Sequence, residues 1–146
     1  MATREFDRRV IMRMLNDQVG EKVHQRLGEQ MIGTLVLNTP VGMPSTWVSP
    51  PPPSYQPGHA RFSWQTRLNQ EVTIDIPGID PGGAATIARG VGTIGKATLN
   101  DSIVFSNNAP YIGRLNQGWS PQQAPGFVDR AIKGAISSLG RSRITI

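Results

Sequence analysis

The residues that could support catalysis or metal binding are few and lie far apart in this sequence. The two histidines, His24 and His59, are 35 positions apart, and neither belongs to an HExxH motif or a metal-ligand spacing. There is no cysteine, which excludes disulfides, thiolate metal sites and a cysteine nucleophile. No serine stands in a GxSxG motif. The sequence therefore predicts no catalytic residue, no metal and no cofactor, and it places each histidine on the surface or at an interface.

The glycine-rich stretch GVGTIGK at residues 90–96 has the composition of a phosphate-binding loop. Such a loop needs a buried strand before it and Ser or Thr directly after its lysine. Here Ala97 follows Lys96, and the preceding residues do not have the pattern of a buried strand. The stretch therefore favours close helix packing over phosphate binding.

The positive charge comes mainly from arginine, which supplies twelve of the fifteen basic residues behind a formal net charge of +5. Arginine suits bidentate contacts at packed interfaces and contacts to phosphate. The basic residues are dispersed, apart from a group near the start and Arg141 and Arg143 at the end. A nucleic-acid-binding domain usually has a denser stripe interleaved with aromatic residues. The pattern favours a protein interface and leaves DNA binding as the alternative.

Apolar residues recur every three or four positions over about residues 4–37, which predicts one long amphipathic helix. Gly20, Gly28 and Gly33 weaken this helix, and a bend or an early end near Gly33 is an open alternative. Asn38-Thr39-Pro40 should stop it, because the residue before a proline avoids helical dihedral angles. Such a helix is longer than one small core needs, so we expect part of it to pack on a neighbouring subunit.

Residues 38–60 are rich in proline and include the run Pro50 to Pro53. Proline excludes a helix or a central strand here, and consecutive prolines favour the stiff polyproline II conformation. We expect an extended arm, with Trp47 and Tyr55 as anchors that pack on its docking surface. A ligand for proline-reading domains is the rival interpretation.

Residues 61–139 are expected to form the core, and their first part alternates as strands do. Arg61 to Ile76 predicts two strands or one long bent strand, with Trp64 in the core. Asp80-Pro81 is a cap for a helix over residues 83–98. A strand over residues 101–106 should then end at a turn formed by Asn107-Asn108.

The last part of the chain predicts a loop, a helix and a tail. The loop carries Tyr111 and Trp119, and the helix runs from Phe127 to Gly140. The tail, residues 140–146, alternates like a short strand and could add to a sheet edge of another chain.

Together these elements predict a single α+β domain over residues 1–146, with one mostly antiparallel sheet packed with helices. No stretch approaches the roughly 20 apolar residues that cross a bilayer. The start, MATREFDRR, lacks the apolar centre of a signal peptide, so we expect a soluble protein made in the cytosol.

Three passages of the chain share motifs with one group of proteins. Residues 39–65 contain TPVGMPSTW and PPPPSYQPGHARFSWQ, and residues 106–128 read SNNAPYIGRLNQGWSPQQAPGFV. Between them lies DPGGAATIARG. In combination, these motifs resemble the neck or tail-completion proteins of tailed double-stranded-DNA bacteriophages, with the similarity covering about residues 35–135.

The resemblance implies a structural virion protein of the phage neck rather than an enzyme. Copies would form a ring, a hexamer, that joins the head-closure components to the tail, assembled in the cytoplasm of the host bacterium. DNA would pass through the channel without sequence-specific binding. A tail terminator that caps the tail tube is the nearest alternative, and a DNA-binding protein is the alternative from another class.

Eight aromatic or basic residues are the candidates for subunit contacts or loop anchors. The resemblance also shows one departure, since an acidic residue is commoner in the family where this chain has Asn116. The eight candidates are Trp47, Tyr55, Arg61, Tyr111, Arg114, Trp119, Arg141 and Arg143.

Overall fold

The structure is a computed structural model and describes residues 8–46, 49–51 and 53–139. The described part has a long N-terminal helix and a two-stranded antiparallel sheet, so the α+β prediction is confirmed. Its elements are, in chain order, α1 (Arg8–Asn38), the 3-10 turn η1 (Pro44–Thr46), α2 (His59–Phe62), β1 (Trp64–Leu68), α3 (Ala84–Ile94), β2 (Ile103–Asn107), α4 (Ile112–Asn116) and α5 (Phe127–Leu139).

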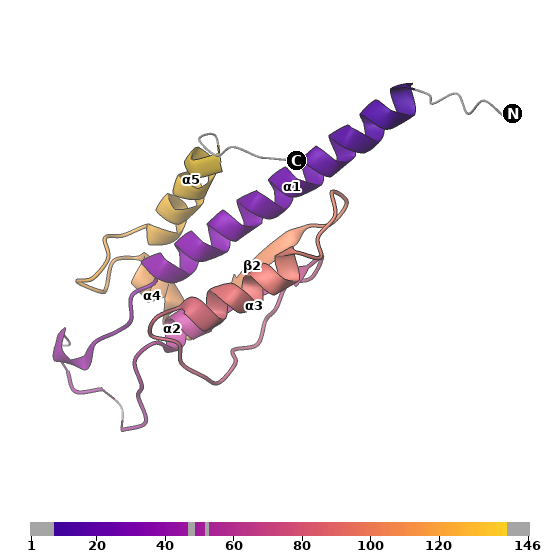
Figure 1. The fold of residues 1–146 in the computed structure, drawn as a ribbon. Helices are drawn as coiled ribbons and strands as arrows, with labels where there is room; N and C mark the ends of the chain where they lie inside the picture. The colour runs from indigo at the N-terminus through magenta and orange to yellow at the C-terminus, as the bar shows by residue number, and fades with distance from the viewer. Residues whose placement is uncertain (1–7, 47–48, 52, 140–146) are drawn as a thin grey trace, which may run out of the picture.

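Helix α1 is the element around which the others gather. Helix α5 lies along one side of it, and α3 and the sheet lie on the other (Figure 1). The core therefore forms around the C-terminal part of α1, where its buried side chains meet those of the sheet, α3 and α5. The buried residues of this cluster are Ile32, Leu35, Val36, Trp64, Ile94 and Ala131.

The glycines of α1 do not break it, so the alternative of an early end near Gly33 is wrong. The helix continues to Asn38. At Gly28, a Cβ atom would lie 2.9 Å from Cδ1 of Ile103 and 3.2 Å from Cγ2 of Ile94. A glycine at this position lets β2 and α3 approach the helix backbone, and this close packing outweighs the weak helix propensity of glycine.

The prediction of two strands over Arg61 to Ile76 is wrong in extent. Only Trp64–Leu68 forms a strand, paired antiparallel with Ile103–Asn107. Arg61 lies in α2 instead, and β1 ends at Leu68, after which Asn69 turns the chain with a φ of 58°. After that turn the chain is a loop in which Ile74 is 71% exposed, so the apolar alternation there did not mark a buried face.

Side chains, rather than a third strand, hold this loop against the sheet. The amide of Gln65 donates to the carbonyl of Ile74, and the Ser106 hydroxyl accepts from the N–H of Val72. The turn expected at Asn107-Asn108 also relies on side chains. Asn107 accepts from the N–H of Ala109, and Asn108 donates to the carbonyl of Val72.

Helix α3 begins at Ala84, and its N-cap residue is Gly83 rather than the predicted Asp80. Asp80 still serves its first turn, because its carboxylate accepts from the N–H of Gly83 and from both the N–H and hydroxyl of Thr86. Burial would raise the pKa of Asp80, but these hydrogen bonds hold it below its ordinary value. Asp80 therefore caps the first turn of α3 from a position before the helix begins.

The loop expected through Tyr111 and Trp119 contains a short helix, α4, and this corrects the prediction. The first turn closes when the N–H of Leu115 bonds to the carbonyl of Tyr111. The last helix, α5, starts at Phe127 as predicted, and that side chain is buried. Its predicted end at Gly140 lies outside the described residues, as do residues 4–7 of the predicted first helix.

Within the described ranges, no helix has the combination of length and apolar character that crossing a membrane would require.

Candidate functional site

The base of the proline-rich loop is tied to the body of the molecule by hydrogen bonds. The Tyr55 hydroxyl lies 2.7 Å from the carbonyl oxygen of Gly42 and 3.3 Å from that of Val41. The N–H of Gly58 donates to the same Val41 carbonyl at 3.1 Å. The N–H of Val41 donates to Oε1 of Gln122 at 3.1 Å. Both ends of the loop are therefore fixed beside each other, and Tyr55 is a loop anchor.

The loop itself extends away from the helices at the end of the molecule opposite to the start of α1 (Figure 1). Within the described part of the proline run, Pro50 and Pro53 are exposed and Pro51 is half-buried. The fixed base of the loop therefore holds Pro50 and Pro53 in solvent.

His59 begins α2 and bonds through both ring nitrogens to acceptors. Its Nδ1 lies 2.8 Å from the carbonyl oxygen of Gly78, and its Nε2 lies 2.8 Å from Oδ2 of Asp75. The Gly78 carbonyl can only accept, so Nδ1 carries a proton, and the Asp75 carboxylate favours a second proton on Nε2. Burial lowers the pKa of His59, but the Gly78 carbonyl and the Asp75 carboxylate raise it above its ordinary value.

Ser63 completes this cluster but has the wrong geometry for a nucleophile. Its hydroxyl lies 2.9 Å from the His59 carbonyl oxygen and 3.0 Å from Oδ1 of Asp75, and the residue is fully buried. A serine nucleophile needs a neutral histidine nitrogen as a base. Nε2 of His59 is 3.3 Å from the hydroxyl but bonds to Asp75. The three residues therefore fix the loop of Asp75 and Gly78 on α2.

Tyr111 lies on the other side of His59, with the ring centroids 6.4 Å apart and the planes tilted by 55°. Burial, and then the charges of Tyr55 and Asp75, raise the pKa of Tyr111 to about 12, although a hydrogen bond from the backbone of Ala60 opposes this. The Tyr111 hydroxyl therefore keeps its proton at neutral pH.

These aromatic side chains enclose a partly open pocket of about 340 Å³. Tyr55, His59 and Tyr111 contribute the rings, and the exposed residues that line it include Gln56 and Ile79. Two of the predicted residues, Tyr55 and Tyr111, are thus brought together although they are far apart in the sequence. We name this site the tyrosine pocket.

Arg61 does not line the pocket and instead caps the end of α1. Its Nε donates to the carbonyl of Thr39 at 2.8 Å, and its Nη2 donates to that of Leu37 at 3.1 Å. Its Nη1 donates to the carbonyl of Pro81 at 2.7 Å. The last carbonyls of a helix lack partners within it, and a cation there also suits the helix dipole. Arg61 is therefore an anchor within its own subunit.

Arg114 and Trp119 form a separate pair outside the pocket. The guanidinium carbon lies 5.2 Å from the centroid of the indole ring, which is within the range of a cation–π contact. Trp119 is 69% exposed, so the pair offers an aromatic surface to solvent. The remaining predicted residues, Trp47, Arg141 and Arg143, lie outside the described residues.

The sequence did not predict His59, Asp75 and Gly78 as one cluster. Their spacing matches no motif. In addition, most of the loop that brings them together was expected to be a strand. The sequence also did not predict that the side chain of Asn107 links β2 to α2, where it donates to the Ala60 carbonyl at 2.9 Å. In both cases the signal lies in the tertiary structure alone.

Comparisons with known proteins do not name this site. No protein-family model, no curated protein and no solved structure matches the chain. Among the described residues, no three His, Cys, Asp or Glu side chains gather in a way that could hold a metal ion.

Proposed function

We propose that this protein is a structural component of the neck of a tailed bacteriophage, where copies form a ring that joins the head-closure components to the tail. The motifs of residues 39–65 and 106–128, which resemble the neck and tail-completion proteins, are the first support for this function. Such a protein acts by binding, through contacts with other copies of itself and with adjoining virion proteins.

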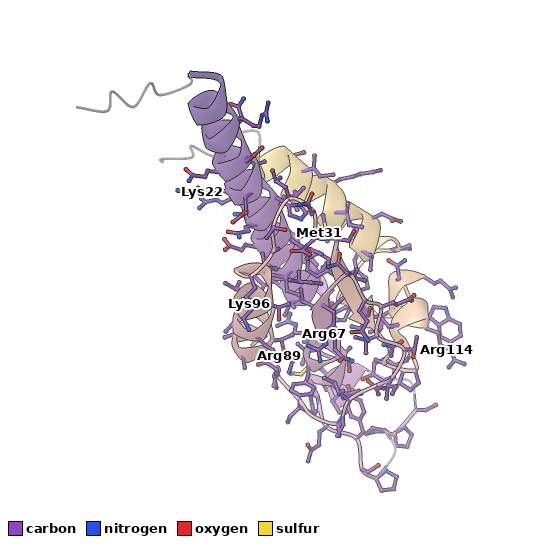
Figure 2. The ribbon with its side chains drawn as sticks, turned by 90° about the vertical axis from the view of Figure 1, so that its right-hand side faces the viewer. Lys22, Met31, Arg67, Arg89, Lys96 and Arg114 are labelled. Carbon is purple, nitrogen blue, oxygen red and sulfur yellow. The ribbon has the colours of Figure 1, made fainter. Side chains whose placement is uncertain are left out.

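The observation that carries the proposal is the length of α1, whose earlier apolar residues are only half-buried in their own subunit. The helix has 31 residues and is roughly 46 Å long at about 1.5 Å per residue. Among its described side chains, the buried ones begin only at Gly28. Val19, Val23 and Leu27 come earlier on the apolar face and are half-buried. The helix extends beyond both α3 and α5 in each view (Figure 1, Figure 2).

Val19, Val23 and Leu27 therefore keep some apolar surface that their own subunit does not cover. Burial is favourable by about 25 cal/mol per Å² of apolar surface, so a neighbouring subunit that covered this face would add stability. Exposed Leu99, which packs against Gly20, and Ile136 on α5 extend the same kind of surface. This supports association with protein rather than a solitary function.

Several arginines whose side chains the structure describes make contacts within the chain, and this weighs against the DNA-binding alternative. Arg61 bonds to three carbonyls, and Arg89 lies 4.6 Å from the centroid of the Phe62 ring. Arg130 donates to the side chain of Gln123 and to backbone carbonyls. In Figure 2, the labelled arginines Arg67, Arg89 and Arg114 come from three separate elements, β1, α3 and α4. A phosphate-binding surface needs unengaged cations side by side.

Imaging of phage particles that carry a tagged copy of the chain tests the proposal. We expect the tag at the connector between head and tail, in a symmetric ring, and a deletion should leave heads without joined tails. Tags at the free end of headless tails would instead indicate the tail terminator. Particles that assemble normally without the chain would contradict the proposal.

A second measurement addresses the DNA-binding alternative. We expect affinity for double-stranded DNA to be weak in moderate salt and to lack sequence preference. A tight complex whose association constant falls steeply as salt rises would favour the DNA-binding protein instead, since that slope counts the phosphates neutralised.

A further inference from the structure

The tyrosine pocket has the composition of a site for a proline-rich segment. Polyproline II helices dock in grooves lined by aromatic residues, where proline rings pack on ring faces and polar side chains bond to the free backbone carbonyls. Tyr55, His59 and Tyr111 contribute the ring-bearing side chains to the lining of the pocket. Ser54 and Gln56 are exposed and line the same pocket, so their side chains can donate to carbonyls of a ligand.

The pocket is held in shape before any ligand arrives. The Tyr55 hydroxyl bonds to the carbonyl of Gly42, and both nitrogens of His59 bond to the loop that carries Ile79. Half-buried Tyr111 keeps a hydroxyl proton that it can donate. A preformed site loses little conformational entropy on binding, and a stiff polyproline segment loses little as well.

The size of the pocket limits the ligand to a short segment. About 340 Å³ lies at the lower end of the range of roughly 300–1,000 Å³ that is usual for small-ligand pockets. A few residues of extended chain fit such a volume, whereas a folded domain does not.

The chain itself carries such a segment at Pro50 to Pro53, next to the pocket but outside it. Pro50 and Pro53 are exposed, so they do not fill the pocket of their own subunit. Ser54, which follows Pro53 directly, already belongs to the pocket wall. Pro50 and Pro53 are therefore accessible to another molecule.

We propose that the proline run of one subunit docks in the tyrosine pocket of the next copy. Such a contact is head-to-tail, because the donating and receiving surfaces differ, and repetition with the right rotation closes a ring. The inference rests on the proposed function and deepens it by naming one contact between neighbouring subunits.

A peptide tests the pocket independently of assembly. A fluorescent peptide of residues 48–54, VSPPPPS, should bind the full chain, and its matched control VSAAAAS should bind at least about tenfold more weakly. The variant Gln56→Ala/Ile79→Ser changes two exposed pocket residues and should lose most of this binding. The control Gln70→Ala/Ile74→Ser changes two exposed residues that do not line the pocket and should bind as the parent does.

Mixing two defective variants tests the contact between copies. The arm variant replaces Pro50, Pro51 and Pro53 with serine, and the pocket variant is Gln56→Ala/Ile79→Ser. Each should fail to form rings alone. Mixed, they should form a one-to-one pair and no closed ring, because one intact arm and one intact pocket remain. Native mass spectrometry distinguishes these species.

The results separate this inference from the proposed function. Rings of normal size from both variants would overturn the docking contact while leaving the neck ring intact. A parent chain that binds VSPPPPS in the pocket yet stays monomeric would show that the pocket binds proline. It would contradict both the contact between copies and the ring. Equal binding of both peptides would overturn the docking inference.

Discussion

At the scale of single residues, the site depends on side chains that hold loops rather than on reactive groups. His59 shows this most clearly, because its two nitrogens bond to Gly78 and Asp75. A neutral ring has only one N–H, so loss of a proton would break one of these bonds. The charged ring can therefore keep both bonds, whereas the neutral ring can keep only one.

This charge predicts how stability depends on pH. The folded state raises the pKa of His59 above 6.5, so its contribution is fully present below that value and is lost as pH rises through the folded pKa. Asp75 is the charged partner, and the nearby Tyr111 stays neutral in this range. We expect the urea midpoint of the parent chain to decrease as the pH is raised from about 6 to about 8.

Two variants isolate this effect. Asp75→Asn keeps the shape of the partner but removes its charge, and His59→Gln removes the titrating ring. Both should flatten the fall in urea midpoint. A parent that becomes more stable over the same pH range would contradict the imidazolium assignment.

Asn116 has a structural role at the start of α5. Its Oδ1 accepts from the N–H of Val128 at 3.1 Å, and its carbonyl accepts from the N–H of Gly126. The side chain thereby serves one of the unpaired N–H groups at the start of α5. An acidic residue could accept the same bond without any ion pair.

We therefore predict that Asn116→Ala lowers the free energy of unfolding by about 1 kcal/mol, the usual effect of losing a helix cap. Asn116→Asp should retain or increase stability, because a negative charge suits a helix N-terminus. Chemical denaturation of both variants checks this, with Gln117→Ala as the control at an exposed neighbour. An alanine variant as stable as the parent would show that Asn116 does not cap α5.

At the scale of elements, close packing on α1 decides where glycine is required. A Cβ atom at Gly90 would lie 2.8 Å from Cγ1 of Ile32 and 2.9 Å from Oγ1 of Thr66. Two residues further along α3, nothing lies within 4 Å of a Cβ built at Gly92. The same substitution should therefore have opposite effects at the two positions.

Gly90→Ala should destabilise the fold by roughly 1–3 kcal/mol, because overpacking displaces α3 from α1. Gly92→Ala should stabilise it by up to about 1 kcal/mol, because alanine is the better helix former. Thermal and chemical unfolding of the two variants gives the comparison. Equal effects would mean that α3 does not pack on α1 through Gly90.

The elements also show which features could be predicted from the sequence. Helices α1 and α5 were predictable because their apolar spacing reflects burial on one face, and Trp64 is in the core as expected. The strand predicted through Ile74 failed because its alternation was not matched by burial. Tyr55 and Tyr111 were identified singly, but their meeting in one pocket depends on how the loops after α1 and β2 are fixed. That information lies in tertiary contacts.

At the scale of the whole molecule, the proposed ring depends on surfaces that one copy leaves uncovered. The early part of α1 has no buried side chain among those described, and Pro50 and Pro53 are exposed beside a pocket that suits proline. The proline run and the pocket are different surfaces, so the proposed contact between them is head-to-tail rather than symmetric.

The mass of the native assembly tests this central claim most directly. Native mass spectrometry of the full chain, over a range of protein concentrations, should give one discrete closed oligomer with few intermediates, and a hexamer is expected. A single monomeric species at every concentration, in virions as well as in solution, would contradict the proposed ring.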